Sequence, residues 1–247
     1  MLLKDKTAVI TGCSRGIGFS ILENFSSNGA NIIACVRKKT DHFQESVQKL
    51  ADKYKVKINV VSFDLQFEEE IERGLADLKK ITNSVDILIN NAGINQMSLF
   101  QMTSLKTFKN VFEINFFSIV NVTQKILKIM KKNSYSKIIN ISSNAVSLAD
   151  AGRSAYTPSK AALVSLTEVL SKELSNYKIN VNAIAPGLVN TDMMTNTPKK
   201  VIEEAIKNTP LNKVAQPNDV ANTALFLASD NSNHITGETI YVTGGMR

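Results

Sequence analysis

Short runs of apolar, β-branched residues alternate along the chain with longer stretches in which apolar residues recur every three or four positions. Runs of the first kind are typical of buried strands, and stretches of the second kind predict amphipathic helices. Strands that alternate with helices form a parallel sheet covered on both faces, so we expect a doubly wound α/β fold with seven strands and right-handed crossovers. The strands are predicted at Thr7–Thr11, Asn31–Val36, Lys57–Phe63, Val85–Asn90, Lys137–Ser142, Asn180–Ala185 and Thr239–Thr243.

The composition favours one domain in a reducing compartment. The chain has 247 residues, 43% of them hydrophobic, and no stretch rich in Pro, Gly or Ser divides it, so residues 1–247 are predicted to form a single domain. No segment approaches the roughly 18 apolar residues of a membrane span, and the first residues carry charges too early for a secretory signal. Cys13 and Cys35 are expected to be packing residues, and a cytoplasmic location is expected.

The net charge of +7 does not indicate a nucleic-acid-binding protein, because the lysines are spread over predicted helices without interleaved aromatic residues. We attribute the positive surplus to solvated helix faces and to attraction for anionic ligands such as phosphates. The two histidines, His42 and His234, are far apart and lack cysteine or paired acidic neighbours, so no metal site is predicted.

A glycine-rich segment follows the first predicted strand directly. Residues 11–18 read Thr-Gly-Cys-Ser-Arg-Gly-Ile-Gly, and a helical stretch to Ser27 comes next. Glycines let the backbone approach a pyrophosphate closely, and the helix offers free N–H groups and the positive end of its dipole. The segment therefore predicts a nucleotide site that contains Gly12, Ser14, Arg15, Gly16, Ile17 and Gly18.

The second strand ends in three basic residues, at 37–39, where NAD-selective proteins of this architecture usually place an acid. Arg37 and Arg15 are predicted to clamp a 2′-phosphate through charge-assisted hydrogen bonds of roughly 1.5–3 kcal/mol each. Because about 1.4 kcal/mol is tenfold in affinity, one such bond suffices to favour NADP(H). A solvated basic turn is the alternative. Further cofactor contacts are expected at the ends of the third and fourth strands, from Asp64, Leu65, Asn91, Ala92 and Gly93.

Tyr156 and Lys160 lie four residues apart in a stretch whose apolar spacing predicts a helix over Ala155 to Lys172. That spacing places the phenol and the ammonium on one face, one turn apart. A free tyrosine loses its proton at about pH 10, but an adjacent cation favours the phenolate and lowers the pKa. The pair therefore predicts a general acid or base. Since the same spacing also occurs by chance on helices, the prediction depends on a cofactor and a partner elsewhere in the chain.

These motifs together resemble the short-chain dehydrogenase/reductase family over essentially the whole chain. Thr-Gly-x-x-x-Gly-Ile-Gly, Asn-Asn-Ala-Gly, Asn-Ile-Ser-Ser, Tyr-x-x-x-Lys and Pro-Gly occur in the order and at the spacing of that family. The resemblance implies a Rossmann-type fold and hydride transfer between the nicotinamide of NADP(H) and a carbonyl carbon. It also implies the catalytic residues Asn115, Ser143, Tyr156 and Lys160.

The family pattern assigns a role to each of these residues. Ser143, rather than Ser142, lies at the family's spacing before the tyrosine and holds the carbonyl oxygen, which Tyr156 protonates. Lys160 is implied to lower the tyrosine pKa and to bind the nicotinamide ribose, and Asn115 to hold a water that relays protons. The segment after the sixth strand resembles the family segment that contacts the nicotinamide carboxamide, through Pro186, Gly187, Val189 and Thr191.

Residues 190–212 are predicted to form a substrate lid in which Met193 adapts to an apolar substrate; a simple surface loop is the alternative. Within the family the chain most resembles 3-oxoacyl-[acyl-carrier-protein] reductases, in residues 137–143 and 234–246. An acidic acyl carrier protein is then the implied partner, and the net charge, with Lys131 and Lys132, is compatible with docking it.

Arg153 departs from that pattern, because carrier-protein reductases usually have Gln three residues before the tyrosine. The segment Gly-Arg-Ser-Ala-Tyr is also seen in relatives that act on sugars, polyols and other small alcohols, and an arginine there can bind a substrate carboxylate or phosphate. Despite this departure, the resemblance in residues 137–143 and 234–246 leads us to predict NADPH-dependent reduction of a 3-oxoacyl thioester in fatty acid biosynthesis. A dehydrogenase of sugars or polyols and a non-catalytic NADP-binding sensor are the alternatives. The resemblance also implies a homotetramer, joined through the helices of Asn115 and Tyr156 and the last strand.

Overall fold

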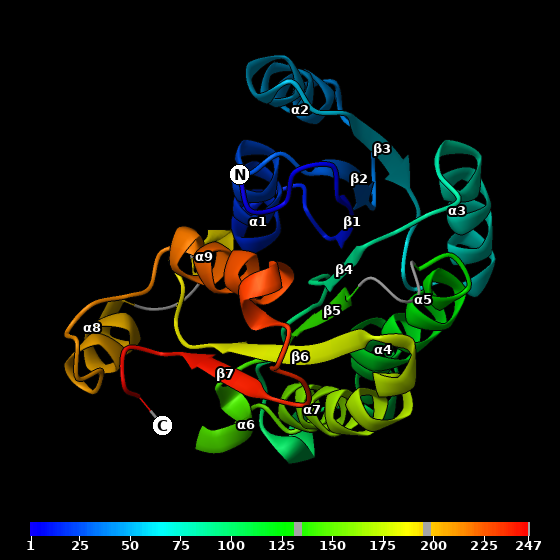
Figure 1. Ribbon diagram of the computed structural model, residues 1–247. Coiled ribbons are helices and arrows are strands. Elements are labelled where there is room, and N and C mark those ends of the chain that lie inside the picture. The colour runs from blue at the N-terminus through cyan, green and yellow to red at the C-terminus, as the bar shows by residue number, and fades with distance from the viewer. Residues whose placement is uncertain (131–134, 195–198, 247) are drawn as a thin grey trace.

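A single parallel sheet organises the part of the chain that the computed structural model describes, which comprises residues 1–130, 135–194 and 199–246 (Figure 1). The strand order is β3-β2-β1-β4-β5-β6-β7, and each neighbouring pair is parallel. The predicted seven-stranded, doubly wound fold is confirmed. The strands are β1 (Thr7–Thr11), β2 (Asn31–Val36), β3 (Ile58–Ser62), β4 (Ile87–Asn90), β5 (Ser136–Ile141), β6 (Ile179–Pro186) and β7 (Thr239–Val242).

The predicted strands match the observed ones to within two residues at each end. β1 and β2 have the predicted bounds because turn residues flank both strands. β4 begins at Ile87 and not at Val85, since Val85 pairs instead with Met130 in an isolated bridge. β6 continues one residue further than predicted, to Pro186, which is still in register with Val242 of β7.

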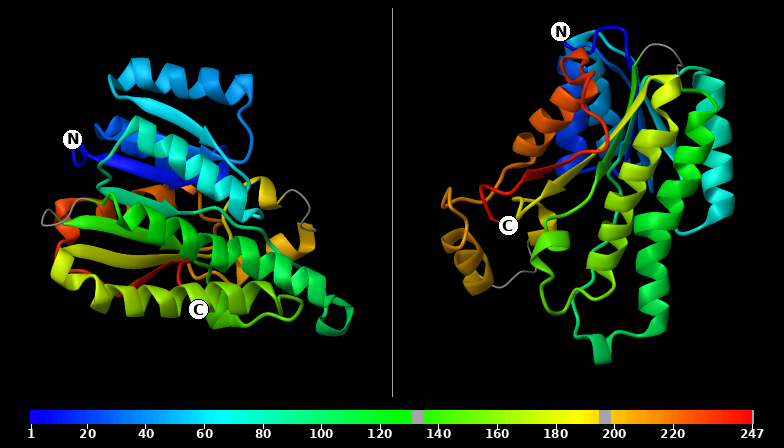
Figure 2. Two further views of the ribbon diagram at one scale, coloured as in Figure 1. Left: turned by 90° about the vertical axis from the view of Figure 1, so that its right-hand side faces the viewer. Right: turned by 60° about the horizontal axis from the view of Figure 1, so that its bottom comes forward.

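Helices cover both faces of the sheet (Figure 2). One layer consists of α1 (Gly16–Ser27), α2 (Asp41–Tyr54) and α9 (Pro217–Ala228), and the other of α3 (Glu68–Ile81), α5 (Ser118–Leu127) and α7 (Tyr156–Glu173). Smaller elements link these layers to the strands: α4 (Leu105–Phe112), α6 (Ala145–Leu148), α8 (Lys199–Lys207), the 3-10 helices η1 (Phe100–Met102), η3 (Ser175–Tyr177), η4 (Asp192–Met194) and η5 (Asp230–Ser232), and the π-helix η2 (Glu113–Phe117).

Each helical layer has its own apolar core, because successive side chains of a strand point to opposite faces. In β1, Ile10 packs in the core that contains Phe25 of α1, and its neighbour Val9 packs in the core that contains Leu75 and Leu78 of α3. The strand order reverses at the boundary between β1 and β4. In such sheets ligands bind beyond the carboxyl ends of the strands at this point.

A ladder of buried polar side chains joins the sheet to the helices beside that boundary. Asn90 Nδ2 donates to Asn140 Oδ1 at 2.8 Å and to Thr123 Oγ1 at 3.1 Å, and Asn140 Nδ2 donates to Thr167 Oγ1 at 2.9 Å. These bonds connect β4 and β5 to α5 and α7. The ladder therefore fixes α7, the helix of Tyr156 and Lys160, relative to the strands.

We predict that Asn140→Ala lowers the free energy of unfolding by about 1–3 kcal/mol, because buried groups on Asn90 and Thr167 lose a hydrogen-bond partner. Urea denaturation followed by circular dichroism measures the change. Asn59→Ala is the matched control, since Asn59 is an exposed strand residue of β3, and its effect should stay within about 0.5 kcal/mol. Equal effects of the two substitutions would contradict a structural role for the ladder.

Candidate active site

The glycine loop between β1 and α1 lies directly against the loop that follows β4. A Cβ atom on Gly12, whose φ is +65°, would lie 2.7 Å from the Cα of Ala92. A Cβ on Gly18 would overlap the carbonyl oxygen of Gly12 and would lie 2.5 Å from Asn91 Nδ2. Real side chains do not fit at such distances, so glycine is required at both positions by packing within the protein itself.

Thr11 and Asn91 hold the two loops together. Thr11 Oγ1 donates to the carbonyl of Ile89 at 3.3 Å and accepts from the backbone N–H groups of Asn91 and Ala92 at 3.1 and 3.2 Å. Asn91 Nδ2 donates in return to the carbonyls of Thr11 and Gly12, at 3.0 and 2.9 Å. Thr11 is not among the site residues predicted from the sequence. Its position at the end of β1, immediately before Gly12, is the feature of the sequence that could have identified it.

The start of α1 fits an anion. Its N-cap residue, Arg15, makes no side-chain cap hydrogen bond, and the first turn contains no acidic residue. The N–H groups of that turn and the positive end of the helix dipole are therefore available to a phosphate. Gly16, with φ of +56°, begins the helix, and a Cβ there would lie 3.3 Å from Thr191 Cγ2. The loop and helix fit the pyrophosphate of a dinucleotide, with Ser14 exposed and Ile17 packed against the core.

Basic residues lie beside this loop at the end of β2. Cys35 pairs in register with Thr11, and Gly12 N–H donates to the carbonyl of Cys35 at 2.9 Å, so exposed Arg37 follows two residues later on the same edge. Arg15 is also exposed and lies 3.6 Å from the carboxylate of Asp192. A pair this exposed contributes about 0–1 kcal/mol, so the contact holds Arg15 only weakly.

The turn after β3 brings Asp64 and Leu65 to the same edge of the sheet. The Asp64 carboxylate accepts from the N–H of Gln66 at 3.0 Å, and the Asp64 N–H donates to the carboxylate of Glu70 at 2.9 Å. Leu65 packs against the core. The local hydrogen bonds fix the backbone of this turn, and they also occupy part of the acceptor capacity of Asp64.

The segment after β6 returns toward the glycine loop. Gly187 N–H donates to the carbonyl of Val242 at 3.0 Å, and Val189 pairs with Ala215 in an isolated bridge. Thr191 Oγ1 donates to the carbonyl of Val189 at 3.4 Å, and its methyl group faces Gly16. The structure thus brings the residues predicted at Pro186, Gly187, Val189 and Thr191 to the edge of the sheet that carries the glycine loop.

Two adjacent serines at the end of β5 have different partners. Ser142 Oγ donates to the carbonyl of Lys160 at 3.1 Å and so secures α7 to the strand. Ser143 Oγ accepts from the N–H of Ala145 at 3.2 Å, and its hydroxyl is close enough to that of Tyr156 to lower the pKa of the phenol. Of the two serines, Ser143 is therefore the one whose hydroxyl acts on Tyr156.

The pKa of Tyr156 lies above its ordinary value because burial disfavours the phenolate; the hydrogen bond with Ser143 and the charge of Arg153 offset only part of this effect. The sequence predicts that Lys160 lowers the pKa of Tyr156, so the direction of the pKa shift is opposite to the prediction. Lys160 Nζ donates to the carbonyl of Ile141 at 2.8 Å, and burial lowers the pKa of Lys160 to about 8. A raised pKa keeps Tyr156 protonated at neutral pH, as a proton donor requires.

Asn115 lies fully buried in the π-helix η2, within the otherwise α-helical run from α4 to α5. Its Oδ1 accepts from the N–H of Ile94 at 2.8 Å, and its Nδ2 donates to the Ile94 carbonyl at 3.0 Å and to Ser159 Oγ at 3.1 Å. A Cβ on Gly93 would lie 3.1 Å from Asn115 Oδ1 and 3.3 Å from Lys160 Nζ. Asn115 and Lys160 therefore converge on Gly93. Single-turn π-helices are frequent at functional sites, but the chain's apolar spacing predicts only an ordinary helix here.

Arg153 lies next to Tyr156, with the guanidinium carbon 5.9 Å from the centre of the phenol ring. Its Nε is 4.0 Å from the Asp150 carboxylate. Gln96, a buried residue that the sequence does not single out, accepts the N–H of Ala155 through its Oε1 at 3.1 Å. The side chain of Met193, and Lys131 and Lys132, lie outside the described residues.

A cavity of about 230 Å³ lies between α8, the segment that follows it, and the ends of β6 and β7. Its lining includes Leu188, Ile206, Leu211, Val242 and Thr243, but none of the four predicted catalytic residues. One wall is close to the site nonetheless, because a Cβ on Gly187 would lie 3.2 Å from the Cα of Thr243. The predicted lid region therefore borders the site through the residues after β6.

The described residues also bear on metal sites, membrane spans and reactive thiols. No three or more His, Cys, Asp or Glu side chains gather there in a way that would hold a metal ion. Within residues 1–130, 135–194 and 199–246, no helix has the length and apolar character needed to cross a membrane. Cys13 and Cys35 are buried free thiols whose pKa values are raised by burial, which suits packing residues.

Known proteins are similar to this chain over nearly the whole of both lengths. A family model described as enoyl-(acyl carrier protein) reductase matches residues 12–247. The 3-oxoacyl-[acyl-carrier-protein] reductase FabG of Aquifex aeolicus is 35% identical over 99% of this chain and 98% of its own. A 3alpha-hydroxysteroid dehydrogenase of Mediterraneibacter gnavus is 35% identical over 100% of this chain and 99% of its own.

Solved structures agree with the sequence relatives. A glucose/ribitol dehydrogenase from Brucella melitensis has a TM-score of 0.90 at 28% identity, covering 100% of this chain and 98% of its own. A putative NAD(P)-dependent gluconate 5-dehydrogenase from Beutenbergia cavernae, with bound NADP, has a TM-score of 0.92 at 30% identity, covering 99% and 97%. Because the matches extend from the glycine loop to the last strand, the chain belongs to the short-chain dehydrogenase/reductase family of NAD(P)-dependent oxidoreductases, which act on CH–OH groups.

Proposed function

We propose that the protein reduces a 3-oxoacyl thioester, carried on acyl carrier protein, to the 3-hydroxyacyl product in fatty acid biosynthesis, with NADPH as the reductant. The observation that carries the proposal is the convergence of Lys160 and Asn115 on Gly93, with Ser143 close enough to the Tyr156 hydroxyl to lower its pKa. The FabG protein of Aquifex aeolicus, similar over nearly the whole of both chains, supports the acyl substrate. The proposed partner is therefore acyl carrier protein.

The proposed chemistry assigns one task to each catalytic side chain. When bound, the cofactor supplies a hydride to the carbonyl carbon. Negative charge then develops on the carbonyl oxygen, where the Ser143 hydroxyl donates a hydrogen bond and the Tyr156 phenol delivers a proton. Lys160 and Asn115, which converge on Gly93, would bind the nicotinamide ribose and hold the water that returns a proton to the site.

The cofactor proposal is NADP(H). Gly12, Ser14, Gly16, Ile17 and Gly18 would form the pyrophosphate cradle with the start of α1, and Arg15 and Arg37 would bind the 2′-phosphate. Asp64 and Leu65 would lie at the adenine. The remaining contacts are assigned to the loops after β4 and β6, through Asn91, Ala92, Gly93, Pro186, Gly187, Val189 and Thr191.

The same residues can serve a different substrate. The similarity to a steroid dehydrogenase and to a putative gluconate 5-dehydrogenase, and the position of Arg153 beside Tyr156, favour a second candidate, a dehydrogenase of sugars, polyols or other small alcohols. In that case Arg153 would bind an anionic substrate group, and Met193 would contact the substrate from the lid. A non-catalytic NADP-binding sensor is the remaining alternative, and the complete set of four catalytic residues argues against it.

We also propose that residues 190–212 form the substrate lid. The segment contains η4 and α8, and the cavity beneath α8 leaves this helix incompletely packed against the ends of the strands. Fewer packed contacts lower the free energy of local opening, which a lid needs. For its location we propose the cytoplasm, where free thiols such as Cys13 and Cys35 remain reduced.

Turnover tests the reaction. With acetoacetyl-CoA as the substrate, we predict NADPH oxidation by the native protein and a loss of at least about 100-fold in kcat/KM for Tyr156→Phe, because the proton donor is removed while the ring remains. The decrease in NADPH absorbance measures the rate. Tyr54→Phe is a matched control, since Tyr54 ends α2 on the opposite layer, and it should leave the rate unchanged.

Two outcomes would contradict the proposal in different ways. A panel that compares acetoacetyl carrier protein with ketosugars would sink the fatty-acid assignment if the sugars alone reacted. Tight NADPH binding without turnover on any carbonyl would instead indicate the sensor.

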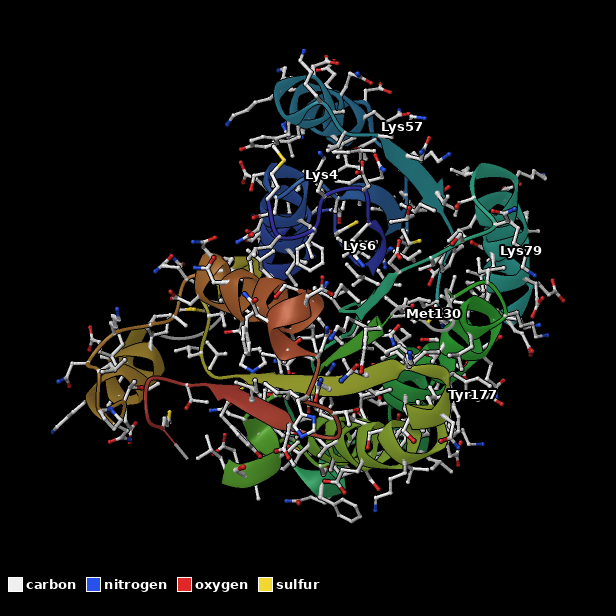
Figure 3. The ribbon with its side chains drawn as sticks, in the orientation of Figure 1. Lys4, Lys6, Lys57, Lys79, Met130 and Tyr177 are labelled. Carbon is white, nitrogen blue, oxygen red and sulfur yellow. The ribbon has the colours of Figure 1, made fainter. Side chains whose placement is uncertain are left out.

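Cofactor affinity tests the proposed phosphate site. We predict that Arg37→Asp weakens NADPH binding by roughly tenfold or more and NADH binding far less, because one charge-assisted bond is lost and a like charge faces the phosphate. Fluorescence titration measures both affinities. Lys57→Asp is the control. Lys57 immediately precedes β3 (Figure 3), so it lies at the amino ends of the strands, whereas Arg37 follows the carboxyl end of β2. Equal weakening of NADPH and NADH would show that Arg37 does not bind the 2′-phosphate.

We propose a homotetramer in which the helices of Asn115 and Tyr156 and the last strand meet those of other copies. A surface hollow of about 340 Å³ on α4 and η2 supports this proposal, because it is lined by Phe108, Phe112 and Phe117 with Lys109 and Glu113. An apolar hollow of this kind is typical of an interaction surface.

We predict that Phe117→Glu reduces the assembled mass, because a charge would be buried between subunits. Phe117 is 53% exposed in the single chain, and Phe67 at the start of α3 is 52% exposed, which makes Phe67→Glu a matched control. Sedimentation velocity should show four copies for the native protein and for Phe67→Glu, but fewer for Phe117→Glu. A native protein that sediments as a monomer would overturn the assembly.

A further inference from the structure

Arg153 faces the phenol ring of Tyr156. The family pattern instead assigns the lowering of the tyrosine pKa to Lys160, one helical turn after the tyrosine. The Arg153 guanidinium carbon is 5.9 Å from the ring centre, and its side chain is 27% exposed. Lys160 directs its Nζ to the carbonyl of Ile141 instead. Of these two cations, Arg153 therefore makes a cation–π contact with the Tyr156 ring, and Lys160 is engaged by the backbone of β5.

The backbone that carries Arg153 is held on two sides. Arg153 pairs with Ser98 in an isolated bridge, and the Ser98 N–H donates to the carbonyl of Gly152 at 2.9 Å. On the other side, Gln96 Oε1 accepts the N–H of Ala155 at 3.1 Å, and Gln96 Nε2 donates to Ser98 Oγ and Thr103 Oγ1 at 3.0 and 3.1 Å. These bonds fix the point from which the arginine side chain extends.

Asp150 is the counter-ion of this arginine. Asp150 precedes Arg153 by three residues, and its side chain is 49% exposed. Its carboxylate lies 4.0 Å from Arg153 Nε. At that distance the carboxylate offsets part of the positive charge but does not make a close bidentate pair, so guanidinium N–H groups and residual charge remain directed at the surroundings. The ring of Tyr156 is among those surroundings.

We propose that Arg153 is a positioning residue for proton transfer by Tyr156, and that Asp150 sets how much of the arginine's charge acts on the phenol. A cation near the face of an aromatic ring is attracted by the ring and favours ionisation of its hydroxyl. The charged groups around the phenol are Arg153 and Asp150 from the segment before α7 and Lys160 from α7 itself; Ser143, which follows β5, and Asn115 and Gln96 are neutral. The inference rests on the proposed role of Tyr156 as the proton donor.

The effect of each group on the pKa of Tyr156 agrees with this arrangement. Burial raises it, and the Ser143 hydrogen bond and the Arg153 charge lower it. Removal of the arginine should therefore make the phenol a weaker acid still. Removal of the Asp150 charge should have the opposite effect, because the arginine would then act on the ring without a counter-ion.

Direct titration of Tyr156 tests the proposal without requiring turnover. The chain has five tyrosines and no tryptophan, so tyrosinate absorbance in the near ultraviolet is not obscured by indole. Subtracting the titration of the corresponding Tyr156→Phe protein isolates the single phenol. We expect Arg153→Gln to decrease the ionisation constant of Tyr156 by about threefold to tenfold, Asp150→Asn to increase it, and Arg153→Lys to retain most of the native value.

Arg73→Gln is the matched control. Arg73 makes the same kind of i, i+3 pair, with Glu70 at 3.7 Å, but on α3, and its loss should leave the Tyr156 titration unchanged. A Tyr156 titration in Arg153→Gln that coincides with the native one would overturn the proposal, provided that thermal unfolding shows the variant to be folded. If Arg153→Gln does not fold, Asp150→Asn decides the matter, because an unchanged or decreased ionisation constant contradicts the proposal.

Kinetics supply a second readout. In the alcohol-oxidation direction, where Tyr156 must accept a proton, we expect the rise of kcat with pH to move to higher pH in Arg153→Gln while the KM for the cofactor stays constant. A merely structural role would change KM and stability without moving the pH profile. If no carbonyl or alcohol reacts, the proposed function fails, yet the titration still tests the influence of Arg153 on Tyr156.

Discussion

The close contact between the ends of β1 and β4 is the constraint on which the site depends. Gly12 and Gly18 leave no room for side chains against Asn91 and Ala92, and the hydroxyl of Thr11, the last residue of β1, is hydrogen-bonded to the backbone at the end of β4. This contact gives the glycine loop its shape and directs the start of α1 toward the crevice. It also places Gly93 where Asn115 and Lys160 converge, so the phosphate end and the reacting end of the site share one backbone framework.

The reacting end has a second support in the polar ladder of Asn90 and Asn140. The position of α7 relative to the end of β5 determines the distance between the hydroxyl groups of Tyr156 and Ser143. The ladder, together with the Ser142 bond to Lys160, fixes that distance through buried groups that have few other partners. Buried polar networks of this kind are costly when incomplete and rigid when complete.

Much of the fold follows from local patterns in the sequence. Alternation of β-branched runs and amphipathic stretches predicts the strands to within two residues, because most of the strands are buried on both faces and are rich in apolar residues. The choice of Ser143 follows from motif spacing. In contrast, the π-helix at Asn115 and the anchoring of Ala155 by Gln96 depend on contacts between distant segments, which no local pattern contains. The direction of the Tyr156 pKa was predicted wrongly because the charge of Lys160 is visible in the sequence and burial is not.

The packing of the glycine loop has a consequence for how such a protein can change over evolutionary time. Enlarging position 12 or 18 requires the backbone of the neighbouring loop to move, so these positions can accept new side chains only through several simultaneous substitutions. Arg37, in contrast, is exposed at the end of β2 and can be replaced singly without disturbing the core. Under the proposed assignment of Arg37 to the 2′-phosphate, a lineage could therefore change its cofactor preference by a single substitution at the end of β2 while the glycine loop stays constant.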